Sequence, residues 1–206
     1  KRLSLKVKLN KDYGSLQGMN TFYLHKLRSR TYPFSFIFQE LISNFGFHSV
    51  EHKLALVNFN NSSWGLMDMQ ENFGNTLMAK NKLKESLIIK FSDDYYWKNY
   101  LRANDNPLPR EKYWLSHPRL FIDSVSKPYS KLTGNELLKF NYILNILKED
   151  EYQNLLFNQR MLSETEEILA IWGNFHPAGL NNIYFYFNPF TLKLEPILTD
   201  QGRFFD

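Results

Sequence analysis

Apolar and polar side chains alternate over the first ten residues of the chain. Leucines and Val7 occupy the odd positions from 3 to 9, while Lys6, Lys8 and two small polar residues occupy the even ones. A period of two predicts a β-strand with one half-buried face and one basic face. Further strands are expected at 22–24, 53–59, 64–69 and 87–91. The turn residues at 60–63 predict that the third and fourth of these five strands form a hairpin.

One helix is expected among these strands. Apolar residues at 34, 37, 38, 41, 42 and 45 share one helical stripe, which predicts a helix over 34–45. Pro33 suits the first turn of this helix, and Gly46 suits its end. After the last of the strands, residues 95–119 are rich in aromatics and proline and predict an irregular connection.

Helical patterning returns further along the chain. Thr133 is expected to cap a helix over 135–148, and helical character continues as far as Phe157. Ser163 and Glu166 have the spacing of a capping box, which predicts that another helix begins there and runs to about residue 172.

The order of these elements indicates the fold class. A strand-rich part over 1–94 is followed by a mainly helical part over 95–206, which predicts an α+β fold. The chain has 206 residues, 43% of them hydrophobic and 17% aromatic, so it can bury a substantial core. This composition argues against disorder.

Charge and cysteine content narrow the function only slightly. The formal net charge is +4 and the pI about 9.1, which favours anionic ligands such as nucleotides but is common in proteins without them. No nucleic-acid-binding motif appears, so no nucleic-acid partner is expected. The absence of cysteine excludes disulfides and thiolate chemistry. No membrane span is expected, and the first ten residues lack the apolar core of a signal peptide.

The residues with the most informative chemistry lie between 172 and the end. A loop over 173–180 leads into a predicted hairpin with strands at 183–187 and 192–198, followed by Asp200, Gln201 and Gly202. Protein kinases place a catalytic loop, a hairpin and an Asp-x-Gly in this order.

Three side chains have the spacing that this chemistry needs. His176 and Asn181 are five places apart, as are a kinase's base and its metal-binding asparagine, and Asp200 begins the Asp-x-Gly. Carboxylate and amide oxygens suit the divalent ion that neutralises nucleotide phosphates. Each residue also has an ordinary explanation, because Asp is common in turns, His176 could be a plain loop histidine, and Asn181 could simply begin a strand.

Two stretches of the sequence resemble the CotH kinase family, which is named for a spore-coat protein and is widespread in bacteria. The first stretch covers residues 1–94 and includes the basic strand, Arg30 and the segments 18–24, 40–46, 56–60 and 64–71. The second is the hairpin over 181–202, with Tyr-Phe-Tyr-Phe-Asn-Pro and Leu-Glu-Pro-Ile.

The resemblance implies a two-lobe kinase-like fold that transfers phosphate from ATP to Ser or Thr of a protein, with Mg²⁺ or Mn²⁺. Asp200 matches the metal-binding aspartate, and Asn181 lies at the second metal position. Lys8 is the expected phosphate-contacting lysine, with Lys6 as a competitor. Glu40 is expected to pair with that lysine, and Glu71 to lie at the connection between the lobes. Both glutamates are also explained as exposed surface charges.

One departure from the family pattern leaves the activity open. Family members considered active carry an aspartate where this chain has His176, which implies either a kinase with a histidine base or an inactive pseudokinase or structural surface protein. The resemblance also implies a spore-coat, cell-surface or secreted location, and a chain that continues beyond both given ends.

Overall fold

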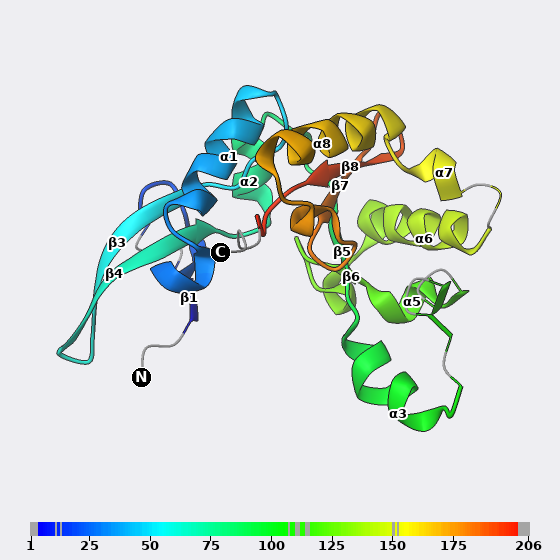
Figure 1. Cartoon of the computed structure of the whole chain (residues 1–206), viewed down its shortest axis with the longest axis horizontal. Coiled ribbons are helices and arrows are strands. Elements are labelled where there is room, and N and C mark those ends of the chain that lie inside the picture. The colour runs from blue at the N-terminus through cyan, green and yellow to red at the C-terminus, as the bar shows by residue number, and fades with distance from the viewer. Residues whose placement is uncertain are drawn as a thin grey trace.

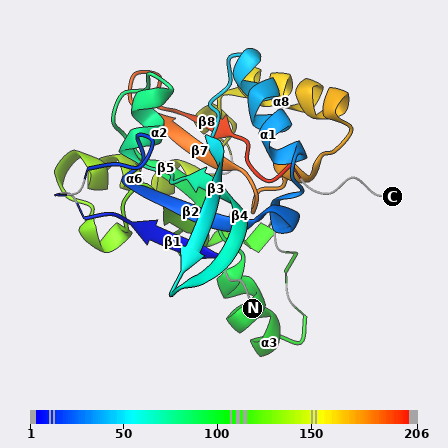
Figure 2. The same cartoon turned by 90° about the vertical axis from the view of Figure 1, so that its left-hand side faces the viewer.

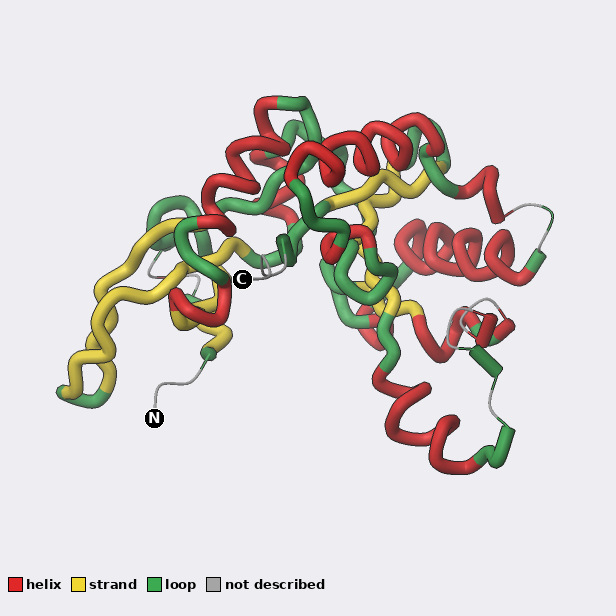
Figure 3. The backbone as a smooth tube through the Cα atoms, viewed as in Figure 1, coloured by secondary structure: helices red, strands yellow, loops and turns green. Residues whose placement is uncertain are grey.

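The computed structural model describes residues 4–10, 12, 14–106, 108–109, 112–113, 116–149, 151 and 153–201. Within these residues the chain forms two four-stranded antiparallel sheets with helices packed around them (Figures 1 and 3). The predicted α+β class is confirmed. No helix in the described part of the chain is both long and apolar enough to cross a bilayer.

The first sheet is built from the first four strands in the order β1-β2-β4-β3. These strands are β1 (Leu5–Lys8), β2 (Thr21–Lys26), β3 (His52–Phe59) and β4 (Ser62–Glu71). The predicted hairpin is confirmed, and its loop contains only Asn60 and Asn61, both with positive φ. Asparagine tolerates that backbone conformation, which matches the twist of the two strands. The hairpin projects from the rest of the molecule in Figure 1.

Helix α1 (Phe34–Asn44) follows the 3₁₀ turn η2 (Leu27–Arg30) and packs beside the first sheet. Its extent agrees with the prediction, but only part of its apolar stripe is covered. Phe38 and Ile42 are fully buried, whereas Phe34, Ile37 and Phe45 are each between 43% and 54% exposed. The helix therefore uses a narrower face for packing than the sequence pattern indicates.

The second sheet has the order β6-β5-β7-β8. Its strands are β5 (Ile88–Phe91), β6 (Ile122–Ser124), β7 (Tyr184–Asn188) and β8 (Lys193–Ile197). The first sheet ends at Glu71, and β5 pairs with β6 and β7. The change of sheet thus falls before the predicted boundary at residue 94. In Figure 2 the first sheet lies in front of the second.

Helices surround the second sheet. They are α2 (Asn75–Lys80), η3 (Tyr96–Tyr100), α3 (Leu101–Ala103), α5 (Pro118–Phe121), η4 (Tyr129–Lys131), α6 (Gly134–Lys148), α7 (Gln153–Leu156), α8 (Gln159–Trp172) and η5 (His176–Ala178). The prediction of an irregular segment at 95–119 is wrong where η3, α3 and the start of α5 form.

The caps of the two long helices were predicted with different success. Thr133 begins α6 as expected, and its backbone N–H donates to Glu136 Oε2 at 3.3 Å. The predicted start of the next helix at Ser163 is wrong. Helix α8 begins one turn earlier, because the side chain of Asn158 accepts a hydrogen bond from Met161 N at 3.3 Å and caps it there.

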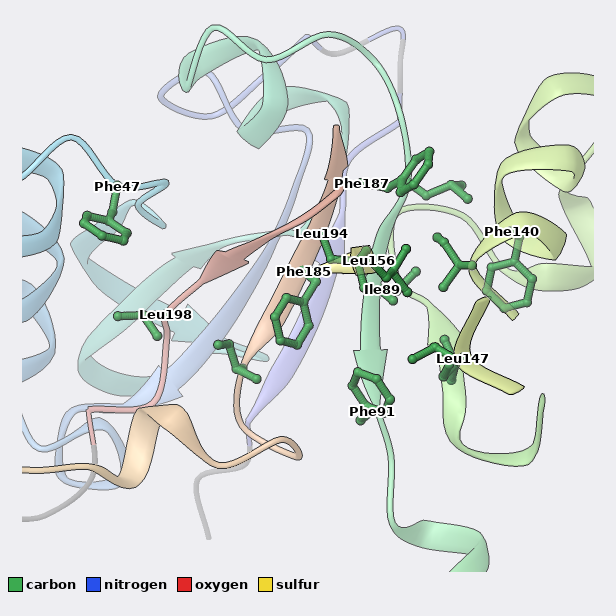
Figure 4. Packing of buried hydrophobic residues seen from close by; sticks show 14 of the residues in the cluster. Phe47, Ile89, Phe91, Phe140, Leu147, Leu156, Phe185, Phe187, Leu194 and Leu198 are labelled. Atoms are coloured by element: carbon green, nitrogen blue, oxygen red, sulfur yellow. The ribbon is translucent and has the colours of Figure 1, made fainter. Parts of the chain in front are cut away.

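The largest core joins the second sheet to α1, α6 and α8. Figure 4 shows side chains of β5, β7 and α6 meeting in it. Phe38 of α1 contacts Trp172 at the end of α8 with ring centroids 5.1 Å apart, and Figures 1 and 2 show these helices side by side. Gln39 adds a buried link, because its amide donates to Leu198 O at 3.0 Å and accepts from Val50 N at 2.7 Å. These contacts hold the two sheets in one orientation.

Candidate functional site

His176 and Asp200 meet where the loop after α8 approaches the end of β8. His176 Nε2 lies 3.5 Å from Asp200 Oδ2, and the two side chains are 48% and 44% exposed. Gly173 ends α8 with φ of 76°, and His176 N donates to Asn174 Oδ1 at 2.9 Å, so the loop returns toward the sheet. The structure therefore brings together two of the predicted site residues. Gly202, the last residue of the predicted Asp-x-Gly, lies outside the described residues.

The asparagine that contacts His176 is Asn182, one place beyond the predicted Asn181. Asn182 Nδ2 donates to His176 O at 3.0 Å and lies 3.3 Å from His176 Nε2. Thr199 Oγ1 donates to Asn182 O at 3.2 Å, which ties this loop to the residue before Asp200. Asn181 belongs to the same loop and turns toward Gly179, because a Cβ added at Gly179 would lie 3.2 Å from Asn181 Oδ1. Asn182 therefore holds the His176 loop in place, and Asn181 lies beside it in the same loop.

Tyr184, at the start of β7, lies at the junction of the two sheets. Its ring stacks on Phe73 with centroids 3.9 Å apart, and Lys90 Nζ lies 5.1 Å from the ring centroid. Burial raises the pKa of Tyr184 to about 12; Tyr23 and Asp200 raise it further, and Arg30 opposes them. Groups of both sheets therefore influence the Tyr184 hydroxyl.

Arg30 lies on the side of the first sheet and is joined to the segment that carries Asp200. Gln201, which is 2% exposed, donates from Nε2 to Arg30 O at 2.9 Å and also contacts Thr31 Oγ1. Nη2 of the Arg30 guanidinium lies 3.2 Å from Nε2 of His25. Burial, helped by the charge of Arg30, lowers the pKa of His25 to about 4, so the imidazole is neutral at pH 7 and can accept this hydrogen bond.

The two lysines of β1 lie on the same face of the first sheet. Lys6 Nζ is 5.1 Å from the centroid of the Tyr23 ring. Lys8 pairs in register with Thr21 at the other end of the strand, and both lysines are exposed. Within the described residues, no ion pair or hydrogen bond joins Lys8 to Glu40.

A polar cavity of about 470 Å³ lies beside the start of β2. Its walls come from the start of β2, the segment between β4 and α2, the residues before β5 and after β6, and the first turn of α6. The lining residues are Asn20, Thr21, Asn72, Gly74, Asn75, Thr76, Glu85, Ser86, Ser126, Lys127 and Glu136.

Two neighbour relations connect the cavity with Tyr184. Thr21 lines the cavity, and Tyr23, two residues further on the same face of β2, interacts with Tyr184; two residues of a strand span about 7 Å. Phe73 stacks on Tyr184, and its neighbours Asn72 and Gly74 line the cavity. Phe73 therefore connects the cavity wall with Tyr184.

Two polar atoms of the cavity wall are buried without a hydrogen-bond partner among the described residues. They are Ser86 Oγ and Asn72 Oδ1, and Ser86 as a whole is 8% exposed. An unpaired buried polar atom costs about 1–3 kcal/mol, so such atoms mark places where a ligand or a water would complete the hydrogen bonding.

The two glutamates of the predicted site are not at Asp200. Glu40 is exposed on α1 and lines a separate cavity with Glu51 and Lys80. Glu71 is 1% exposed; its Oε2 accepts from Glu51 N at 3.3 Å and lies 4.0 Å from Lys80 Nζ. The reading of Glu71 as an exposed charge is wrong, because the end of β4 buries its side chain.

The burial of Glu71 leads to a prediction about stability. Burial raises the pKa of this carboxyl, and Lys80 only partly opposes the effect. The folded state thus binds the proton of Glu71 more tightly than the unfolded state does. The contribution of Glu71 to the free energy of unfolding is therefore fully present below the ordinary glutamate pKa. It is lost as the pH rises through the pKa that Glu71 has in the folded state.

We expect Glu71→Gln to remove this loss, so that the variant gains stability relative to the native protein as the pH rises above the ordinary glutamate pKa. Urea unfolding at several pH values measures this difference. Glu40→Gln, at an exposed position on α1, is the matched control and should show no such trend. A difference between Glu71→Gln and the native protein that does not vary with pH would contradict the prediction.

In comparisons with known proteins, no family model and no curated protein matches this chain. Among the described residues, no three His, Asp or Glu side chains gather as a ready metal cluster, and Asp200 supplies the one carboxylate beside His176.

Sequence reasoning did not select four residues of this region: Tyr184, Asn182, Gln201 and Ser86. Asn182 and Gln201 adjoin selected residues, which is the one signal that could have found them. Tyr184 and Ser86 become visible only when the two sheets are brought together.

Proposed function

We propose that this chain is a nucleotide-dependent phosphotransferase of the CotH kinase type, with a kinase-like two-lobe arrangement of its two sheets. It would transfer phosphate from ATP to Ser or Thr of a protein, with Mg²⁺ or Mn²⁺. The observation that carries this proposal is the meeting of His176 and Asp200, whose Nε2 and Oδ2 atoms are 3.5 Å apart. The order of catalytic loop, hairpin and aspartate in the sequence points to the same chemistry.

The donor set at the site suits a hard divalent ion. Mg²⁺ is usually held by one or two carboxylates together with phosphate oxygens and waters, so a single half-exposed Asp200 is sufficient on the protein side. Asn181 could add an amide oxygen from the neighbouring loop. The ion would neutralise charge on the β- and γ-phosphates.

His176 is the candidate base. In the proposed step, the acceptor hydroxyl oxygen forms a bond to the γ-phosphorus, the bond to the β–γ bridging oxygen breaks, and ADP leaves. The proton of the hydroxyl passes to His176 Nε2. An imidazole is suited to this at neutral pH.

We expect His176→Ala to lower phosphate transfer by about 10²-fold or more, because a positioned base contributes 10²–10⁴-fold. His176→Asp, which introduces the residue of family members considered active, should retain transfer. The measurement is incorporation of radiolabelled phosphate into a mixed protein substrate. Equal loss in both variants would argue against a proton-accepting role.

A second candidate is a pseudokinase or structural surface protein, and the same contact favours it. If His176 is protonated, its ion pair with Asp200 competes with a metal for the carboxylate. Nucleotide binding without phosphate transfer by the purified protein, and without dependence on Mg²⁺ or Mn²⁺, would select this candidate over the kinase.

A further inference from the structure

Arg30 combines four features that no other described cation beside the site combines. It belongs to η2 on the first sheet, its side chain is half-buried, its backbone is joined to the Asp200 segment, and its guanidinium retains an unused donor. Lys6 and Lys8 are exposed, and Lys90 lies over the Tyr184 ring.

The unused donor is Arg30 Nε. This atom is buried, and within the described residues no acceptor lies at hydrogen-bonding distance from it. The other end of the guanidinium is held, because Nη2 lies 3.2 Å from His25 Nε2. A guanidinium fixed at one end presents its remaining N–H groups as a planar fork, which matches the oxygens of a phosphate.

His25 is itself held in place by the inner face of the first sheet. Its ring stacks on Tyr23 with centroids 5.9 Å apart. Its register partner on β4 is Asp68, which is fully buried and lies 2.9 Å from His52 Nδ1. The acceptor for Arg30 is therefore part of a packed network, and the orientation of the guanidinium is set before any ligand arrives.

Gln201 links the position of Arg30 to that of Asp200. It is adjacent to Asp200 in the chain, it is buried, and its amide donates to Arg30 O. A buried hydrogen bond therefore joins Arg30 to the residue that follows Asp200.

From this geometry we propose that Arg30 binds the anionic group of the ligand opposite Asp200, as the phosphate-contacting cation of the site. The inference rests on the proposed function and replaces the earlier expectation for Lys8. A phosphate oxygen at Arg30 Nε would complete the guanidinium's hydrogen bonding, while a divalent ion at Asp200 would hold the other side of the same group.

The test is calorimetric titration of the purified protein with three probes: ATP with Mg²⁺, tripolyphosphate with Mg²⁺, and adenosine. We expect Arg30→Gln to lower the affinity for the first two probes by about tenfold to 100-fold, as for the loss of a charge-assisted hydrogen bond. The affinity for adenosine should not change. Arg30→Lys keeps the charge but loses the planar fork, so it should restore only part of the affinity. Arg28→Gln, an exposed arginine of the same turn, is the matched control and should change affinity less than about threefold.

Several results would overturn the inference. One is that Arg28→Gln weakens ATP binding as much as Arg30→Gln does. Another is that Lys8→Gln weakens ATP binding more than Arg30→Gln does. A third is that Arg30→Gln lowers the affinity for adenosine as much as the affinity for ATP. If Arg30→Gln does not fold, the same titrations are made with Arg30→Lys. An unchanged affinity of Arg30→Lys for tripolyphosphate would then contradict binding by the planar guanidinium.

The proposed function fails separately. If the native protein binds neither ATP nor tripolyphosphate, both proposals fall. If Asp200→Ala removes the effect of Mg²⁺ on ATP binding while Arg30→Gln binds normally, the function stands and Arg30 is excluded.

Discussion

Asp200→Ala is expected to abolish the stabilisation of the protein by ATP and Mg²⁺. A ligand that binds only the folded state, at 100 times its dissociation constant, stabilises it by about 2.7 kcal/mol. Asp200 supplies the one carboxylate beside His176 among the described residues, so its removal leaves a divalent ion without an anionic ligand from the protein there. We therefore expect nearly the whole thermal shift, and phosphate transfer with it, to be lost.

A matched variant separates this effect from general charge. Asp105→Ala removes a carboxylate from an exposed position in the segment after α3 and should retain the full shift. Thermal unfolding with ATP alone, Mg²⁺ alone, and both together gives the comparison. A shift that survives in Asp200→Ala would mean that the ion binds elsewhere, and the proposed metal role of Asp200 would then be wrong.

Local sequence patterns predicted elements well where the decisive contacts are local. The β3–β4 hairpin follows from two asparagines between alternating strands, and α6 follows from Thr133 and Glu136 in one capping box. The start of α8 was missed because two capping signals compete in one stretch. Asn158 caps the helix, so the Ser163 spacing falls inside it.

Strand β6 was missed for a different reason. It has three residues, too few for a period of two to be recognised, and it forms because β5 provides a partner edge. Tertiary pairing, which the local pattern does not contain, decides its structure.

In the site, too, residues of a local motif could be predicted, whereas contacts between residues far apart in the sequence could not. His176 and Asp200 were assigned to one site because a catalytic loop, a hairpin and an Asp-x-Gly follow one another in the sequence. The contact of Gln201 with Arg30 joins residues 171 positions apart, and neither residue has a local pattern that predicts it. The phosphate-binding role is therefore assigned to Lys8 by the resemblance and to Arg30 by the geometry. Titration of the two variants distinguishes these assignments.

The buried face of α1 gives the second large effect. Phe38 and Ile37 both belong to the apolar stripe seen in the sequence, but Phe38 is fully buried against Trp172, whereas Ile37 is 50% exposed. We expect Phe38→Ala to lower the free energy of unfolding by about 3–5 kcal/mol, because it leaves a cavity between the helix and the core.

The matched change Ile37→Ala should cost no more than about 1 kcal/mol, since that side chain keeps much of its contact with water. Urea unfolding of both variants measures the difference. Because α1 also holds Gln39 against Leu198, two residues before Asp200, Phe38→Ala should weaken ATP binding as well as stability. Similar stabilities for the two variants would mean that α1 does not pack on the second sheet through Phe38, and the link between the sheets would then have to come from other contacts.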